Sequence, residues 1–233
     1  SSDNSKKNNI EYEIFEAEVI DNEGGLLVSP DEESVEYTSS DKTMVELLDA
    51  EILDEKGNTV DSDKLKPGDR LRIYYNGMIL ESYPAQITAN KIEVIGHNHI
   101  VDGIFAVIDD IYKDDNALNH DITMIAFDTT GWISLTKAET YAILSMAYNK
   151  YGFDIIQGTF DELAEQGLID EDNLYFENGI LIELKDIEIK KGRDKIECSI
   201  QKWRSGLGAI GWDGNAKLNG DEWEITKDMR WIS

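Results

Sequence analysis

The sequence predicts two domains, a small all-β barrel followed by an α+β domain with an antiparallel sheet. Three observations carry this prediction. Residues 12–96 alternate apolar and polar side chains over short stretches and show no long helical pattern. Two capped helical segments follow, and from residue 174 onward the chain again has strand character. A length of 233 residues and a hydrophobic content of 41% suit two globular domains.

The first domain is expected to consist of short strands. The clearest one lies at residues 70–75, where apolar side chains occupy every second position. A turn at 66–69 precedes it, and Asn76 with Gly77 predicts a two-residue hairpin after it. Further strand-like segments lie at 12–19, 26–28, 44–53 and 86–95. Five or six such strands predict a closed or nearly closed barrel.

Four blocks of this domain carry a resemblance to a known family. The blocks at 65–71, 75–77, 81–86 and 91–95 are similar to uncharacterised extracytoplasmic domains of Gram-positive bacteria, many of which are lipoproteins. The likeness is specific over 65–95 and loose over 12–64. It implies an OB-like barrel and an extracytoplasmic location, and the family has no established activity.

The second domain, residues 103–233, is expected to begin after a linker at 97–102. Asp102 is predicted to cap its first helix. Strands are expected at 122–127, 179–190, 195–204, 209–218 and 222–232, with a hairpin at Asn219 and Gly220.

Two further helices are marked by their caps. Thr136 followed three residues later by Glu139 predicts a capping box for a helix over 137–151. Thr159 and Glu162 repeat the pattern for a shorter helix. Helices that precede a run of antiparallel strands predict an α+β fold, without the regular β-α-β alternation of a parallel sheet.

This domain has a likeness of its own. Blocks at 110–112, 118–119, 121–122, 202–209 and 231–233 are similar to C-terminal regions of other Gram-positive lipoproteins of unknown role. The blocks are scattered over most of the domain. The resemblance implies a shared setting and adds no chemistry.

The charge of the chain excludes some partners. The sequence has 22 basic and 48 acidic residues, for a net charge of −26, and the excess is spread over both halves. Such a surface repels the phosphates of nucleic acids and the headgroups of anionic membranes. We therefore expect no nucleic-acid partner, whereas cell-wall fragments, peptides and proteins remain candidate ligands.

Residues 1–11 are expected to form a flexible polar tether. Such a segment is typical of the stretch after the lipidated cysteine of a bacterial lipoprotein, and an ordinary frayed terminus is the alternative. The sequence has no apolar run long enough to span a membrane. We therefore predict an extracytoplasmic protein at the cell surface, anchored only through a lipid upstream of Ser1.

The glycine-rich stretch 203–212 contains the spacing G-x-G-x-x-G. A dinucleotide site would need a helix to start there, and the residues after Gly211 open none, so no cofactor is predicted. The main interpretation is a bent connection between strands. The alternative is a ligand groove in which Trp203, Arg204 and Trp212 bind a sugar or a peptide. Strand alternation places Trp203 and Arg204 on opposite faces unless a bend redirects them.

The spacing of the other candidate site residues is less distinctive. His97 and His99 would hold a metal together with Asp102 or Asp121, and an exposed linker is the alternative. No catalytic motif with recognisable spacing occurs, and Cys198 in a strand suggests a buried, inert thiol.

These observations predict a non-enzymatic binding or accessory module at the bacterial cell surface. The alternative is a hydrolase or other enzyme with its site in the cleft between the domains.

Overall fold

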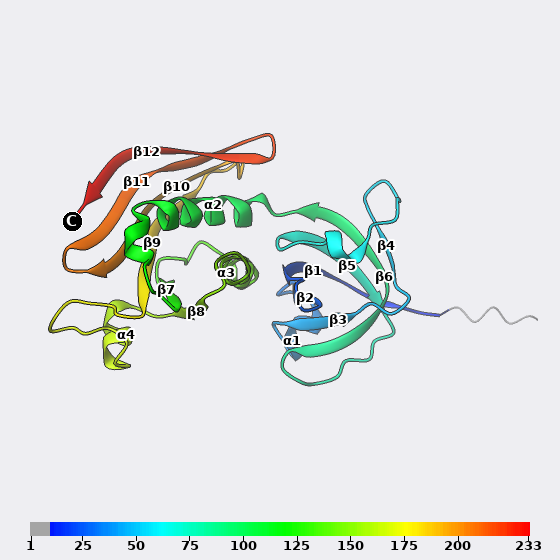
Figure 1. Cartoon of the computed structure of the whole chain (residues 1–233). Helices are drawn as coiled ribbons and strands as arrows, with labels where there is room; N and C mark the ends of the chain where they lie inside the picture. The colour runs from blue at the N-terminus through cyan, green and yellow to red at the C-terminus, as the bar shows by residue number, and fades with distance from the viewer. Residues whose placement is uncertain (1–9) are drawn as a thin grey trace, which may run out of the picture. The chain divides into compact units, whose positions relative to one another are not determined.

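The computed structural model describes residues 10–233 (Figure 1). The chain falls into two compact units, Ser1–His97 and Asn98–Ser233, and each is described by itself. Most of the expected tether, residues 1–9, lies outside the described residues. Among residues 10–233, none of the helices is both long and apolar enough to cross a membrane.

Five strands of the first unit form a closed, mixed barrel. Their order is β3 (Thr43–Glu46), β2 (Leu26–Pro30), β1 (Glu13–Asp21), β5 (Asp69–Tyr75) and β6 (Ala85–His97). Neighbours in this order are antiparallel, and a parallel pairing of β3 with β6 closes the ring. The short strand β4 (Glu51–Leu53) also pairs in parallel with β6. The connections contain the short helices α1 (Val35–Ser39) and η1 (Ser62–Lys64). The prediction of a small barrel is confirmed.

The alternating pattern of β5 builds the barrel core. Leu71, Ile73 and Tyr75 are buried, as their shared face of the strand requires. The Tyr75 hydroxyl donates to Oε1 of the buried Glu36 at 2.9 Å. Burial, together with this carboxylate, raises the pKa of Tyr75 well above its usual range.

The connection after β5 differs from the predicted two-residue hairpin. Gly77 has a positive φ of 86°, as expected, but the connection runs over residues 76–84 before β6 begins. Within it, Leu80 forms an isolated antiparallel bridge with Gln86 of β6. Pro84 has no N–H to donate, and it directly precedes the start of the β6 ladder.

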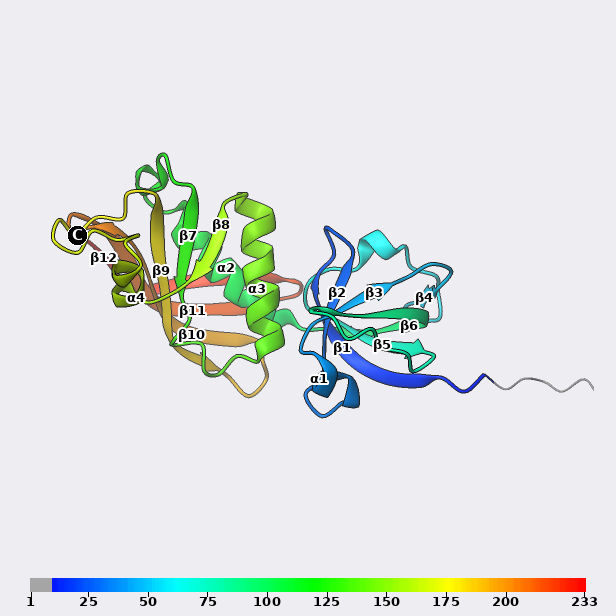
Figure 2. The same cartoon turned by 90° about the horizontal axis from the view of Figure 1, so that it is seen from below.

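The second unit contains a six-stranded sheet that is mixed, so the predicted antiparallel sheet is only partly correct. Strands β9 (Gly179–Ile189), β10 (Lys195–Ser205), β11 (Gly208–Asn219) and β12 (Glu222–Ile232) are antiparallel neighbours. Strand β7 (Met124–Asp128) runs parallel to both β9 and β8 (Asp154–Gln157). Figure 2 shows β9, β7 and β8 side by side. The helix between β7 and β8 makes a β-α-β unit, whose second strand was not predicted because it is only four residues long.

The helices of the second unit begin at polar caps. Helix α2 (His99–Lys113) starts three residues before the expected Asp102, because Asn98 Oδ1 accepts from the Ile100 N–H at 3.1 Å. The expected linker at 97–102 is therefore the end of β6, a cap and the first helical turn. A 3-10 turn, η2 (Asn116–Asn119), follows α2.

The predicted capping box is confirmed. Helix α3 (Lys137–Tyr151) opens with Thr136 accepting from the Glu139 N–H at 3.0 Å, while the Glu139 carboxylate accepts from the Thr136 N–H at 2.8 Å. At α4 (Phe160–Glu165) only half of the predicted capping box forms: the Thr159 hydroxyl accepts from the Glu162 N–H at 3.2 Å, while Glu162 Oε1 accepts from this hydroxyl at 3.2 Å.

Helices pack against both faces of this sheet. Neighbouring residues of β7 point to opposite faces, so Phe127 joins a core with α2 and α3, while Ala126 joins a second core with α4. Neighbouring side chains of β10 also point to opposite faces of the sheet, so the candidate site residues on this strand lie on different faces.

Candidate functional site

Lys202 and Arg204 lie on the same face of β10 and are both buried. Side chains two residues apart on a strand share one face of the sheet, and here both point toward the end of α2 and the segment that follows it. Burying two cations on one face is costly unless their N–H groups find acceptors. The acceptors are oxygen atoms of residues 112–120, at the end of α2 and in the segment after it, and two backbone carbonyls of the segment before β9.

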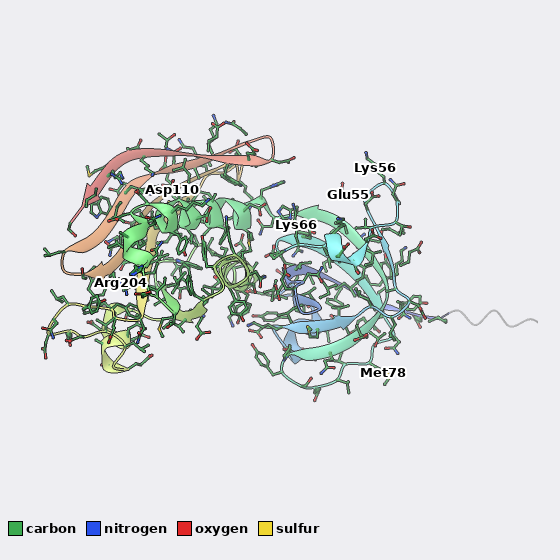
Figure 3. The ribbon with its side chains drawn as sticks, in the orientation of Figure 1. Glu55, Lys56, Lys66, Met78, Asp110 and Arg204 are labelled. Carbon is green, nitrogen blue, oxygen red and sulfur yellow. The ribbon has the colours of Figure 1, made fainter. Side chains whose placement is uncertain are left out.

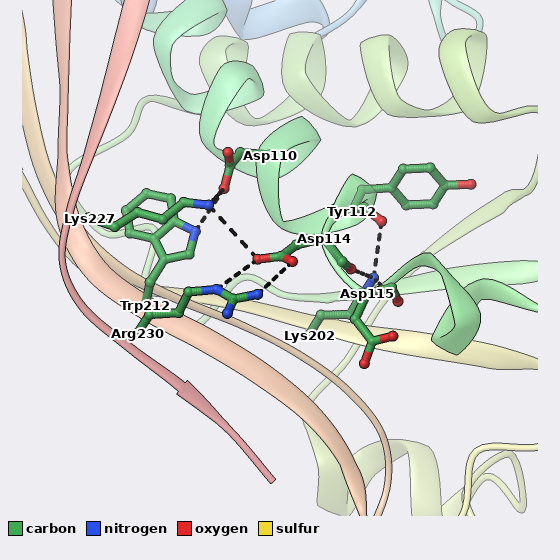
Figure 4. A network of polar contacts seen from close by, with 8 residues as sticks. All are labelled: Asp110, Tyr112, Asp114, Asp115, Lys202, Trp212, Lys227 and Arg230. Atoms are coloured by element: carbon green, nitrogen blue, oxygen red, sulfur yellow. Dashed lines mark hydrogen bonds and ion pairs between the residues drawn. The ribbon is translucent and has the colours of Figure 1, made fainter.

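Lys202 is held by the C-terminal end of α2 (Figure 4). Its Nζ donates to the carbonyl oxygens of Tyr112 at 3.0 Å and Asp115 at 3.2 Å, to that of Asp114, and to Asn119 Oδ1 at 3.1 Å. Burial lowers the pKa of Lys202 to about 8, and the neighbouring Asp115 and Asp114 act in the opposite direction. The ammonium group also meets the negative end of the helix dipole, so it fixes the helix end.

Arg204 is held by four backbone carbonyls. Its Nε donates to Phe176 O at 3.2 Å and its Nη2 to Glu177 O at 2.7 Å. Nη1 donates to Leu118 O at 2.8 Å and to His120 O. A guanidinium has five N–H groups, so one Nη2 N–H has no acceptor among residues 10–233.

A pocket of about 520 Å³ lies beside this guanidinium. Figure 3 shows where Arg204 lies in the second unit. The volume of the pocket falls within the range of small-molecule sites. The Tyr175 ring forms an aromatic wall, with its centroid 5.7 Å from the Arg204 guanidinium carbon. The other lining residues are Ala117, Leu118, His120, Asp121, Glu177, Asn178 and Ser205.

Arg204 differs from the other arginines in its electrostatic environment. The chain has five arginines, and four of them form ion pairs: Arg70 with Asp31, Arg72 with Glu16, Arg193 with Glu139 and Arg230 with Asp114. Arg204 has no carboxylate oxygen within 4.0 Å among the described residues. Arg204 therefore lines a pocket without an acidic partner among residues 10–233, whereas Arg72, which lines a pocket of the first unit, is paired with Glu16.

The structure does not bring the three predicted ligand-binding residues together. Trp203 lies on the opposite face of β10 from Arg204, where its ring packs edge to face on Phe160 with the centroids 5.2 Å apart. Trp212 is fully buried, and its Nε1 donates to Asp110 Oδ2 at 3.0 Å. Of the three, Arg204 alone lines the pocket.

Sequence reasoning missed Tyr175. This residue lies in the loop before β9 and forms an isolated bridge with Ser205 at the end of β10. The bridge is a contact between residues far apart in the sequence, and no local pattern around residue 175 predicts it. The aromatic contribution to the pocket is therefore one that only the tertiary structure reveals.

The glycine-rich stretch forms a tight hairpin. Ser205 pairs with Gly208, so Gly206 and Leu207 make the turn between β10 and β11. After Gly211 the chain continues as strand β11 to Asn219, and the helix of a dinucleotide site does not follow. The interpretation as a connection between strands is confirmed. Gly211 is required because the Trp231 indole lies against it.

The candidate metal residues fall on either side of the boundary between the units. In the first unit, His97 Nδ1 lies 2.7 Å from Asp69 Oδ1. In the second, His99 Nδ1 lies 4.0 Å from Asp102 Oδ2. Asp121 lines the Arg204 pocket and pairs with His120 at 3.0 Å. Metal binding by His97 and His99 stays a prediction.

The fold and site define a mostly β protein of two compact units, with a closed barrel in the first and a pocket of about 520 Å³ beside Arg204 in the second. Residues 18–96, which form nearly the whole barrel, match a family described as Protein of unknown function (DUF3221). The likeness of this part of the chain to an uncharacterised family is confirmed. No curated protein and no solved structure matches the chain.

Proposed function

We propose that this protein is a binding or accessory module of the bacterial cell surface, and that the Arg204 pocket is its ligand site. The observation that carries the proposal is a buried arginine that lines a pocket of about 520 Å³ and has no carboxylate partner among residues 10–233. The ligand would be part of a cell-wall fragment, a peptide or a protein. The negative net charge argues against nucleic acid.

The chemistry of the pocket favours binding over catalysis. An arginine guanidinium stays protonated at physiological pH and cannot act as a general base, but it is well suited to hold an anionic or carbonyl group. The four carbonyl contacts fix its orientation before any ligand arrives. Such preorganisation reduces the entropy cost of binding.

The proposed setting rests on the first unit and on the sequence. Five strands closed by the pairing of β3 with β6 agree with an OB-like barrel. The resemblance to extracytoplasmic domains and the polar residues 1–11 support a lipid-anchored protein outside the cytoplasm. A cysteine immediately before Ser1 in the full gene product is the expected finding, and a leader without it would contradict the anchor.

Ligand screening by NMR tests the binding function. Wild-type protein is titrated with cell-wall fragments, peptides and divalent ions. We expect amide shifts to cluster at residues 117–121 and 175–178 around the pocket. Shifts confined to other surfaces would contradict the proposed site. Turnover of a compound, abolished by Asp121→Asn, would instead establish an enzyme.

A further inference from the structure

The Arg204 pocket presents charges of both signs. Arg204 lines the pocket and is only 8% exposed, and four backbone carbonyls hold its guanidinium in place. Asp121 and Glu177, whose side chains are exposed, line the same pocket. A ligand must therefore meet a fixed positive group at one end and two carboxylates nearer to solvent.

We propose that the pocket binds a small zwitterion with one carboxylate and one ammonium group, as in a free amino acid or a short peptide. This inference rests on the proposed binding function and specifies its ligand. The carboxylate accepts from the Nη2 N–H of Arg204 that has no acceptor in the described chain. The ammonium group lies near Asp121 and Glu177.

The two acidic residues select against other anions. Phosphate and sulfate carry up to two negative charges and no positive charge, so Asp121 and Glu177 repel them. The same carboxylates attract the ammonium group of a zwitterion. The selection thus depends on both ends of the ligand.

Tyr175 offers a contact for the part of the ligand between its two charged groups. Its ring packs against the guanidinium and is 41% exposed, so it offers an apolar surface to the body of a ligand. A cation near this ring also gains from cation–π attraction. Side chains or a peptide backbone would lie along this surface.

A second pocket, in the barrel, does not offer the same chemistry. It measures about 360 Å³ and is lined by Arg72 and Glu93 among others. Arg72 is already paired with Glu16 at 3.0 Å, and Glu93 accepts from the Tyr74 hydroxyl. The arginine of this pocket is thus already paired with a carboxylate of the protein, unlike Arg204.

Isothermal titration calorimetry with four probes tests the inference. The probes are alanyl-alanine, its C-terminal amide, its N-acetyl derivative and sodium acetate. We expect the free dipeptide to bind and each of the other three to bind at least about tenfold more weakly, a factor of ten corresponding to about 1.4 kcal/mol. Equal affinity for the amide would overturn the carboxylate contact. Equal affinity for acetate or for the N-acetyl derivative would overturn the ammonium contact.

A pair of double variants locates the binding. Asp121→Asn with Glu177→Gln removes the two pocket carboxylates, and Glu171→Gln with Asp172→Asn makes the same charge change at exposed positions outside the pocket. We expect the pocket variant to lose the preference for the free dipeptide over its N-acetyl form. The control variant is expected to retain it. Identical behaviour of the two variants would overturn the inference.

The outcomes separate this inference from the proposed function. If no dipeptide binds while another compound shifts residues of the pocket in the NMR screen, the zwitterion is wrong and the binding function stands. If no compound perturbs the pocket, both are wrong.

Discussion

Lys202 and Arg204, two residues apart on β10, hold opposite ends of one loop through its backbone oxygens. Lys202 Nζ contacts the carbonyls of Tyr112 and Asp115, and Arg204 contacts those of Leu118 and His120. The loop between α2 and β7 contributes one side of the pocket. The two cations therefore set the position of the pocket wall whether or not a ligand is bound.

Arg204→Lys is expected to lower the free energy of unfolding by about 2–3 kcal/mol, because a lysine cannot satisfy four carbonyls with the geometry of a guanidinium. Urea denaturation measures the change. Arg230→Lys is the control, since Arg230 pairs with Asp114 at a half-exposed position and its loss should cost less than about 1 kcal/mol. Equal losses in the two variants would contradict the structural role of Arg204.

Gly211→Ala is expected to destabilise the sheet by about 1–3 kcal/mol. A Cβ at this position would lie 2.4 Å from Cζ2 of Trp231 and 2.8 Å from the Ile200 carbonyl oxygen, so the strand or the indole must move. Thermal or urea denaturation reports the effect. Gly206→Ala is the control. Gly206 lies in the turn between β10 and β11, where an added Cβ meets no atom closer than 3.5 Å, so this variant should stay within about 0.5 kcal/mol of wild type. A larger effect at Gly206 than at Gly211 would argue that the turn, and not the close packing, requires glycine.

Thr136→Ala is expected to cost about 1 kcal/mol of stability, because the N–H of Glu139 loses its side-chain acceptor at the start of α3. Thr136→Ser keeps the hydroxyl and should remain within a few tenths of a kcal/mol of wild type. Urea denaturation of the two variants provides the comparison. A loss of the same size in both would point to the methyl group of Thr136 and not to the cap.

The features that the sequence predicted well depend on residues close together in the chain. Thr136 and Glu139 lie three residues apart, and the alternation of Leu71 and Ile73 is visible within one strand. Local spacing dictates these structures, since a helix start and a strand face are each set by a few neighbouring residues. The barrel and the capped helices were predictable for this reason.

The site was less predictable because it depends on contacts between distant residues. Trp212 was a candidate ligand contact, yet it is fully buried and Asp110 accepts from its indole. Tyr175 becomes a pocket wall only through its bridge with Ser205. The parallel pairings of β7 with β9 and with the short strand β8 give the sheet a mixed character that the strand order alone did not suggest. Local patterns do not encode such pairings.

Cys198 provides a test of burial through the pH dependence of stability. Burial, with a smaller contribution from Asp213, raises the pKa of its thiol from 9.0 to about 12. Between these values the unfolded chain has lost the proton that the folded protein retains. The unfolded state therefore binds fewer protons, and the free energy of unfolding falls as the pH rises above 9.0, with a slope that approaches about 1.4 kcal/mol per pH unit.

Comparison with Cys198→Ala isolates this contribution, because the other titrating groups are common to both proteins and cancel. We expect the stability advantage of wild type over the variant to shrink by about 2 kcal/mol between about pH 8 and about pH 10.5. Urea denaturation at intervals across this range measures the difference. A difference that stays constant with pH would show that the thiol ionises equally in both states, and hence that water reaches Cys198 on β10, the strand that also carries Lys202 and Arg204.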